Sequence, residues 1–436
     1  MARDGNAKGM KETKFKDTEL GKIPEEWSVA QVGDLFSMKR NNTLSRDNLN
    51  YSDLAGYKNI HYGDVLVKFG AFIDISTDTL PFVNHDIKFN PDLLENGDVI
   101  IADTAEDETV GKASEVIGIS AKDKVVSGLH TMILHPNEKF ASKYLGYFLN
   151  GEAYHNSLYN SMQGTKVISI SKKAINATSI AYPSLSEQQR IASALSDADA
   201  LVAELDALIE KKRAIMAGTM QELLTGKRRL QGFSEPWVEK KFCEVGTTYN
   251  GLSGKTAADF GHGTSKYVTF VNVIYNAVVN PTILDSVDVS PTERQNAVLK
   301  EDLLLNTSSE TPEEVGMCSY MATSIPNLYL NSFCFGFRVN NKDVCPLFLS
   351  YLLRSATGRS FMLELAQGST RYNLPKRKFL QSAILLPSSL AEQHAIASIL
   401  SDMDAEIAEL EAKRDKYKEV RQGMMQQLLT GKIRLI

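Results

Sequence analysis

The sequence contains a long internal repeat, and this repeat constrains the fold more than any other feature. Residues 184–230 align without a gap with residues 389–435, and the two stretches are identical at 27 of 47 positions. A weaker match continues upstream, where Gln163-Gly164-Thr165 pairs with Gln367-Gly368-Ser369. Self-similarity at a fixed period indicates that one structural unit occurs twice.

The chain therefore consists of two copies of a mixed segment followed by a helical one. We predict a polar N-terminal extension at 1–20, a first mixed domain at 21–184, a first long helix at 185–230, a second mixed domain at 231–388 and a second long helix at 389–436. Trp27 and Trp237 are the only two tryptophans, and each stands near the start of one half. We expect both to anchor domain packing.

The two helical segments carry apolar residues in alternating steps of four and three, which is a heptad pattern. In the first segment these are Ile191, Leu195, Ala198, Val202, Leu205, Ile209, Met216 and Leu223; in the second they are Ile396, Leu400, Met403, Ile407, Leu410, Tyr417, Met424 and Leu428. Such a stripe can pack on the core of its own domain or on a second helix. The length and the two matching copies favour an antiparallel coiled coil between the two helices.

Capping signals mark the ends of both helices. Ser186 with Gln189 and Ser389 with Glu392 predict N-terminal capping boxes. Gly226 and Gly431 stand where a helix C-terminus takes a left-handed residue. Gly218 and Gly423 lie inside the helices, where they predict a close backbone approach, a kink or a late break.

The two mixed segments have the sequence pattern of strand-rich domains. Short apolar runs bounded by Gly, Asn, Asp and Pro predict strands at 65–67, 99–101, 269–271, 303–305 and 333–337. Helices are expected near 138–160 and 344–366. The predicted fold class is α+β: two pseudo-symmetric, strand-rich domains, each followed by a long helix.

The net charge of −5 gives no overall basic footprint of the kind that nucleic-acid binding usually leaves. Local basic clusters nevertheless occur at matching repeat positions, around Lys166 and Lys172-Lys173 and around Arg371 and Lys376-Arg377-Lys378. A charge run is often only a solvated face, but two runs at one repeat position favour specific contact with a duplex. No long apolar stretch or secretory signal is evident. The four cysteines form no Cys-x-x-Cys pair, so a reducing, cytoplasmic setting is expected.

The helical segments are much alike, whereas the mixed segments share little. A surface that meets the same partner twice stays alike, and surfaces that read different ligands do not. We therefore expect two identical partner subunits on the helices and two different ligands on the mixed domains.

Motifs for enzyme chemistry are poorly supported. Gly251-Leu252-Ser253-Gly254-Lys255-Thr256 resembles a phosphate loop, but Tyr249 stands where its first glycine is needed. No Pro-Pro pair occurs, which argues against an amino-methyltransferase tetrapeptide. The seven histidines have no metal-ligand spacing, and His130 and His135 are expected to be strand residues on opposite faces. No catalytic residue and no metal site is predicted.

Several motifs together resemble the specificity (S) subunit of type I restriction–modification systems. They are the start Lys14 to Trp27, the Gln-Gly-Ser/Thr turn, and Pro-x-Leu-x-Glu-Gln-x-x-Ile-Ala opening a long helix that ends Leu-Leu-Thr-Gly-Lys. The turn, the stretch Leu-x-Glu-Gln-x-x-Ile-Ala and the ending Leu-Leu-Thr-Gly-Lys occur in both repeats, and the resemblance covers essentially the whole chain. Departures are mild: Ala391 stands where the first copy has Ser186, and His394 stands where it has Gln189.

The resemblance implies a non-catalytic, DNA-binding scaffold. Each domain would be a target-recognition domain that reads one half of an asymmetric bipartite duplex site. The helices would set the gap between half-sites and dock two modification (M) subunits, which carry S-adenosylmethionine and flip and methylate an adenine. Restriction (R) subunits would join the complex. No cofactor is expected on this chain.

Within this resemblance, polar and basic residues near the Gln-Gly turns and one further cluster are predicted to contact DNA. They are Lys39, Arg40, Thr165, Lys166, Lys172, Lys173, Ser369, Thr370, Arg371, Tyr372, Lys376 and Arg377. Lysines and hydroxyls would hold phosphates, and Arg371 could reach a guanine edge.

Two alternatives stay open. The chain could be a self-sufficient DNA-modifying or DNA-cleaving enzyme with an unrecognised active site, or a coiled-coil adapter with no nucleic-acid role.

Overall fold

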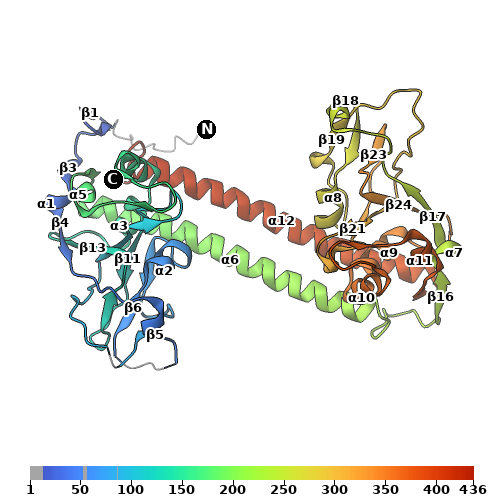
Figure 1. The fold of residues 1–436 in the computed structure, drawn as a ribbon, viewed down its shortest axis with the longest axis horizontal. Helices are drawn as coiled ribbons and strands as arrows, with labels where there is room; N and C mark the ends of the chain where they lie inside the picture. Colours follow the sequence, from blue (N-terminus) through green and yellow to red (C-terminus); the bar gives the residue numbers. More distant parts are fainter. Residues whose placement is uncertain (1–12, 53–55, 86) are drawn as a thin grey trace, which may run out of the picture. The chain divides into compact units, whose positions relative to one another are not determined.

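The computed structural model describes residues 13–52, 56–85 and 87–436, and the chain divides into two compact units. Unit 1 comprises the residues up to Glu204 together with Lys413–Ile436, and unit 2 comprises Leu205–Ala412. Each unit therefore contains one α+β region, part of the long helix α6 and part of the long helix α12 (Figure 1).

Unit 1 is built on a five-stranded sheet whose central strand is completely buried. The strand order is β4 (Phe36–Lys39), β13 (Thr131–Pro136), β9 (Val99–Ala102), β11 (Ala113–Ile117) and β7 (Phe72–Asp74). A second sheet has the order β12 (Val125–Ser127), β6 (Lys58–Ile60), β8 (Phe82–Val83) and β5 (Leu49–Asn50). All four residues of β9 are buried, as a continuous apolar run in the middle of a sheet requires.

Unit 2 repeats this plan with fewer strands. Its larger sheet has the order β17 (Gly246–Asn250), β24 (Cys334–Val339), β20 (Leu303–Asn306) and β22 (Cys318–Tyr320). Its second sheet has the order β19 (Asp285–Val287), β18 (Phe260–Val268) and β23 (Leu328–Leu330). In both units an equivalent pair of strands, β6 with β12 and β18 with β23, runs parallel. The predicted α+β class with two pseudo-symmetric halves is confirmed.

Short ribbons and helices complete each region. In unit 1 they are β1 (Phe15–Thr18), β2 (Gly21–Pro24), β3 (Ser28–Gln31), α1 (Val32–Leu35), β10 (Thr104–Ala105), α3 (Tyr144–Leu149), α4 (Glu152–Leu158), β14 (Ile168–Ser169), α5 (Lys172–Asn176) and β15 (Ser179–Tyr182). In unit 2 they are β16 (Trp237–Lys241), α7 (Phe242–Val245), β21 (Ser308–Ser309), α9 (Pro346–Arg354), α10 (Ala356–Leu365), β25 (Tyr372–Asn373), α11 (Lys376–Gln381) and β26 (Ala383–Pro387). Of the predicted extension at 1–20, residues 1–12 lie outside the described residues, and β1 pairs with β2.

Two of the predicted strands are helices. The run at 65–67 belongs to α2 (Tyr62–Val67), and the run at 269–271 lies at the start of α8 (Phe270–Tyr275). Both helices have an N-cap side chain, because His61 Nδ1 accepts from the Gly63 N–H and Thr269 Oγ1 accepts from the Asn272 N–H. An apolar run of three residues cannot distinguish a strand from a short helix, and the caps decided the outcome.

The long helices α6 (Leu185–Leu223) and α12 (Leu390–Leu428) pair antiparallel, as predicted. In unit 1, Arg421 Nε donates to Asp199 Oδ1 at 2.5 Å, and in unit 2, Lys212 Nζ lies 2.6 Å from Glu406 Oε1. The residue number on α12 falls as that on α6 rises, so the helices run in opposite directions. The heptad residues Ile191, Leu195, Leu205, Ile209, Ile396, Leu400 and Ile407 are buried.

The ends of the helices differ in detail from the predicted caps. The first cap is Ser184, whose Oγ accepts from the Glu187 N–H, and not Ser186, which lies inside the first turn. Gly226 (φ +71°) and Gly431 (φ +68°) are left-handed, as predicted. Helices α6 and α12 continue through Gly218 and Gly423, and an added Cβ at either glycine would meet nothing within 4 Å. These two glycines therefore mark neither a close approach nor a break.

The tail after each long helix is held in the same way in both units. Arg434 binds Glu187 at 2.5 Å in unit 1, and Arg229 binds Glu392 at 2.6 Å in unit 2. Both carboxylates are buried in the first turn of a long helix, where the helix dipole also favours a negative charge. Glu392 thus serves an ion pair and not the predicted capping box.

Each tryptophan covers the glycine that ends a long helix. A Cβ on Gly431 would lie 3.0 Å from the Trp27 ring, and a Cβ on Gly226 would lie 3.3 Å from the Trp237 ring. Trp27 is only 1% exposed. The tryptophans anchor packing, as predicted.

Replacing Arg434 with alanine should lower the free energy of unfolding by about 3 kcal/mol. Its side chain is 8% exposed and that of Glu187 is 2% exposed, so the substitution leaves a buried carboxylate without its cation. Denaturant unfolding of the full chain measures the effect. As a control, Arg228→Ala removes the exposed pair with Glu222 and should change stability by less than about 1 kcal/mol. Equal effects of the two substitutions would contradict a buried ion pair at Arg434.

Candidate DNA interface

Each unit presents a short loop of the same shape at the predicted Gln-Gly turn. Gln163 and Ser169 exchange backbone hydrogen bonds of 2.9 and 2.8 Å at the base of the first loop. Gln367 and Asn373 exchange bonds of 2.9 and 2.8 Å at the base of the second. The two loops therefore keep one geometry although their sequences differ.

The glycine in each loop is required by its backbone. Gly164 has φ +126° and Gly368 has φ +127°, which side chains rarely adopt. A Cβ at Gly164 would lie 1.9 Å from the carbonyl oxygen of Val167, and one at Gly368 would lie 2.1 Å from that of Arg371. The sequence motif Gln-Gly-Ser/Thr is thus the signature of this loop.

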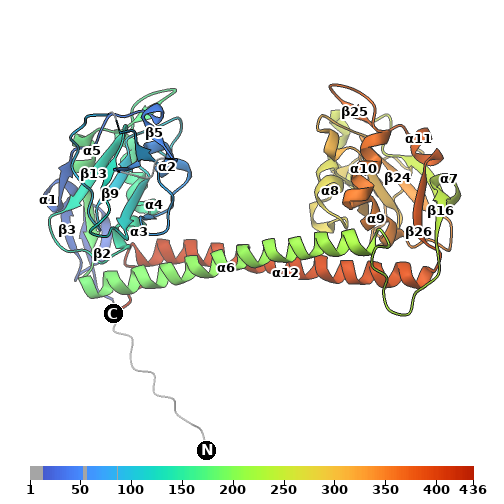
Figure 2. The ribbon, with the colours of Figure 1, turned by 90° about the horizontal axis from the view of Figure 1, so that it is seen from below.

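The loops display most of the predicted DNA-contacting residues to solvent. Thr165, Lys166, Ser369, Thr370 and Arg371 are exposed, and Tyr372 is half-buried. The only ion pair found for Arg371 within the described chain is a 4.0 Å contact with the exposed Glu310. In Figure 2, β25, at the end of the second loop, lies on the side of unit 2 remote from α12.

The basic residues after the loops lie on equivalent short helices. Lys172 and Lys173 open α5 and are exposed. Lys376 and Arg377 open α11, and Arg377 is exposed. Lys376 is directed inward, since its Nζ donates to Asn250 Oδ1 and lies 5.4 Å from the centre of the Phe335 ring. Burial lowers the pKa of Lys376.

The predicted cluster of Lys39 and Arg40 at the end of β4 is distant in sequence from the Gln-Gly loop of unit 1 and contacts other residues. Lys39 Nζ lies 2.9 Å from Asp98 and 2.7 Å from Glu95, and its side chain is 15% exposed. Arg40 is 67% exposed and pairs with Asp92 at 2.9 Å, which lowers the pKa of that carboxyl group. Lys39 holds the loop that carries Glu95 and Asp98, so its charge is already paired within unit 1.

Sequence reasoning missed one position beside the loops. His130 and Phe333 directly precede the equivalent strands β13 and β24, and both are exposed. His130 was expected to be a strand residue, but it lies just before β13 and has φ +54°. The two residues are unlike, so the repeat gave no signal; only their equal distance from the matched elements could have revealed them.

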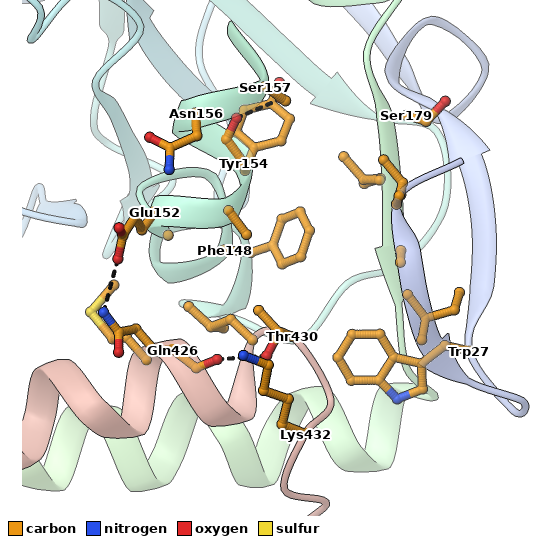
Figure 3. A pocket seen from close by; sticks show the side chains of 18 of the residues that line it. Trp27, Phe148, Glu152, Tyr154, Asn156, Ser157, Ser179, Gln426, Thr430 and Lys432 are labelled. Atoms are coloured by element: carbon orange, nitrogen blue, oxygen red, sulfur yellow. Dashed lines mark hydrogen bonds between the residues drawn. The ribbon is translucent and has the colours of Figure 1, made fainter. Parts of the chain in front are cut away.

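A pocket of about 380 Å³ lies in unit 1 between the end of α12, α4 and β15 (Figure 3). Trp27, Phe148 and Tyr154 supply its apolar lining, and Glu152 accepts a 2.8 Å bond from Gln426. The Trp27 indole N–H has no hydrogen-bond partner among the described residues. Within 13–52, 56–85 and 87–436 no group of three or more His, Cys, Asp or Glu side chains could hold a metal ion.

No helix in the described part of the chain is long and apolar enough to cross a membrane.

Comparisons with known proteins agree with the two-fold organisation. The sequence profile of the "Type I restriction modification DNA specificity domain" matches residues 24–212 and again 234–419. A putative type I restriction enzyme MjaX specificity subunit of Methanocaldococcus jannaschii is 25% identical, over 98% of each chain. The type I restriction enzyme EcoKI specificity subunit of Escherichia coli is 22% identical, over 86% of this chain and 82% of that protein.

Solved structures show the same fold. The type I restriction–modification S subunit from M. genitalium covers 92% of this chain and 96% of its own, with a TM-score of 0.56 and 15% identity. A chain from a study of complex assembly in the type I R-M system has a TM-score of 0.56, 16% identity, and coverage of 94% and 99%.

Gly368→Ala should lower the free energy of unfolding by about 1–3 kcal/mol, because alanine fits neither the φ of +127° nor the 2.1 Å approach. Thermal unfolding measures this effect. The control is Gly423→Ala in α12, which should raise stability by about 1 kcal/mol, since its Cβ enters open space in a helix. A neutral Gly368→Ala would contradict the loop geometry.

Proposed function

The chain belongs to the type I restriction modification DNA specificity domain family, and from this premise we propose that each α+β region reads one half of a bipartite, asymmetric duplex DNA site. The observation that carries the proposal is the repeat itself. The family profile matches both halves, the loops have one geometry in both, and the residues that they display differ. One frame with two sets of exposed side chains is suited to two different half-sites.

The loop cations supply the sequence-independent part of this binding. Lys166, Lys172 and Lys173 in unit 1 and Arg371 and Arg377 in unit 2 are exposed beside a Gln-Gly loop. Lysine and arginine side chains neutralise phosphates, and an arginine can also bind a guanine edge. A net charge of −5 is compatible with such local patches because much of the duplex would be neutralised by partner subunits.

The chain acts as the specificity subunit, and chemistry belongs to its partners. We propose that two modification subunits, each carrying S-adenosylmethionine, methylate an adenine in each half-site, and that restriction subunits join the assembly. No cofactor would bind this chain. We propose a cytoplasmic assembly, which suits a partner that is DNA.

The paired helices offer the partners two equivalent surfaces. Ile215 on α6 and Val420 on α12 occupy matching repeat positions and are 48% and 46% exposed. Apolar side chains exposed at the same place in both copies are suited to two identical partners. The same helices, of 39 residues each, would set the gap between the half-sites.

Replacing residues 231–388 with the equivalent region of a relative should change one half of the methylated site and leave the other half intact. The reason is that each unit has its own sheets and its own loop. Sequencing of methylated adenines in cells that express the chimaera with its modification subunits measures the outcome. The matched control replaces residues 21–184 and should change the other half only. A change in both halves after a single exchange would refute the hypothesis that each α+β region determines one half-site.

Ile215→Asp and Val420→Asp should each remove one modification subunit from the complex, and the double variant should remove both. A carboxylate placed in an apolar contact must lose its hydration without gaining a partner. Light scattering of the purified complex counts the bound subunits. Leu385→Asp on β26 is the control, because Leu385 is as exposed (52%) but lies off the long helices. Full occupancy in the double variant would place the docking surface elsewhere.

The alternative of a self-sufficient enzyme makes a different prediction for the purified chain. Transfer of a methyl group to DNA, or cleavage of DNA, by this chain alone would support it.

A further inference from the structure

A tight turn from Gly128 to His130 precedes β13 in the larger sheet of unit 1, and buried hydrogen bonds hold this turn. The Gly128 N–H donates to Ile60 O at 2.8 Å, while Thr131 Oγ1 and Asn41 Nδ2 both donate to Gly128 O, at 2.6 and 3.0 Å. The turn ends in His130, which has φ +54°. A residue other than glycine keeps this conformation only where its surroundings enforce it, and such positions concentrate at functional sites.

The His130 side chain is partly exposed and flanked by aromatic and hydroxyl groups. Its ring meets that of Tyr62 edge-on at 5.3 Å, and Tyr62 in turn packs against His61 at 4.6 Å. His130 Nδ1 lies 3.4 Å from both Thr104 Oγ1 and Asp103 Oδ1, which leaves Nε2 as the nitrogen available to a ligand. The imidazole is 46% exposed.

His130 also lies beside the first Gln-Gly loop. Thr104 belongs to β10, and β10 pairs with β14, the strand that closes this loop. The Asp103 N–H donates to His130 O at 3.1 Å, and Asp103 O accepts from the Ile170 N–H at 2.9 Å. A single residue thus joins His130 to the loop that displays Thr165 and Lys166.

Unit 2 has the same backbone hydrogen bonds with Phe333 in place of His130, although Phe333 does not share the positive φ of His130. The Thr307 N–H donates to Phe333 O at 2.8 Å, and Thr307 O accepts from the Leu374 N–H at 2.8 Å. The Asn331 N–H donates to Val268 O, as that of Gly128 does to Ile60 O. Phe333 is 56% exposed, beside the loop that displays Arg371.

We propose that His130 and Phe333 are equivalent base-reading residues, one for each half-site. The imidazole of His130 hydrogen-bonds an acceptor on the edge of a purine, and the ring of Phe333 contacts the methyl group of a thymine. The adjacent loop cations hold the neighbouring phosphates, so that the rigid turn carries its side chain to the base edge. This assignment rests on the proposed function and names residues for it.

The test uses the full chain with its modification subunits and maps methylated adenines. His130→Asn keeps a residue that tolerates positive φ but shortens the side chain. It should relax the preference at one base of the half-site assigned to unit 1 by about tenfold or more and leave the other half-site unchanged. Phe333→Ala should do the same at one base of the other half-site. Leu385→Ala, with a similarly exposed apolar side chain in unit 2, should change neither.

The outcomes separate this inference from the function on which it rests. If the wild-type complex methylates no bipartite site, the proposed function fails. If it does, and both variants keep every base preference, the base-reading assignment is overturned. A uniform loss of methylation without a change in preference, in a variant whose thermal midpoint is unchanged, also overturns it, because that is the result of a lost phosphate contact. The thermal midpoint of each variant identifies misfolding.

Discussion

The antiparallel pairing of α6 with α12 is the interaction on which each unit depends. The core of unit 1 includes Ile191 and Leu195 from the start of α6 and Leu428 from the end of α12. The core of unit 2 includes Leu223 from the end of α6 and Leu400 from α12. Neither core is complete without a segment from a distant part of the chain, so the helices are part of both α+β regions and not appendages to them.

This dependence explains why the helical segments stay alike. The same two helices form the seam, close a core and carry polar links to the region beside them: Tyr147 donates to Asp199 at 2.7 Å in unit 1, and Tyr351 donates to Asp404 at 2.7 Å in unit 2. The tails add the matched pairs of Arg434 with Glu187 and Arg229 with Glu392. A substitution in such a helix therefore disturbs several contacts at once.

The parts of the fold that could be predicted from sequence are those in which side chains determine the structure over many residues. The heptads gave both long helices, and the glycines of the Gln-Gly turns marked loops whose backbone only glycine fits. Short elements were harder, because α2 and α8 depend on single caps at His61 and Thr269. The placement of Lys39 also depended on tertiary structure, since its partners Glu95 and Asp98 lie more than fifty residues away in sequence. The DNA contacts themselves stay predictions.

The backbone hydrogen bonds beside each Gln-Gly loop explain how one architecture can read two different half-sites. Asp103 and Thr307 make the same backbone hydrogen bonds to their neighbours, and these bonds do not depend on the side chains involved. Exchange of the exposed side chain at Phe333, or of His130 for a residue that tolerates its φ of +54°, should therefore leave the sheets and the loops in place. In the helices, by contrast, the packing and the ion pairs of the side chains themselves hold the structure together. Recognition regions can diverge on a constant backbone while the paired helices cannot, and this physical difference accounts for the uneven preservation of the repeat.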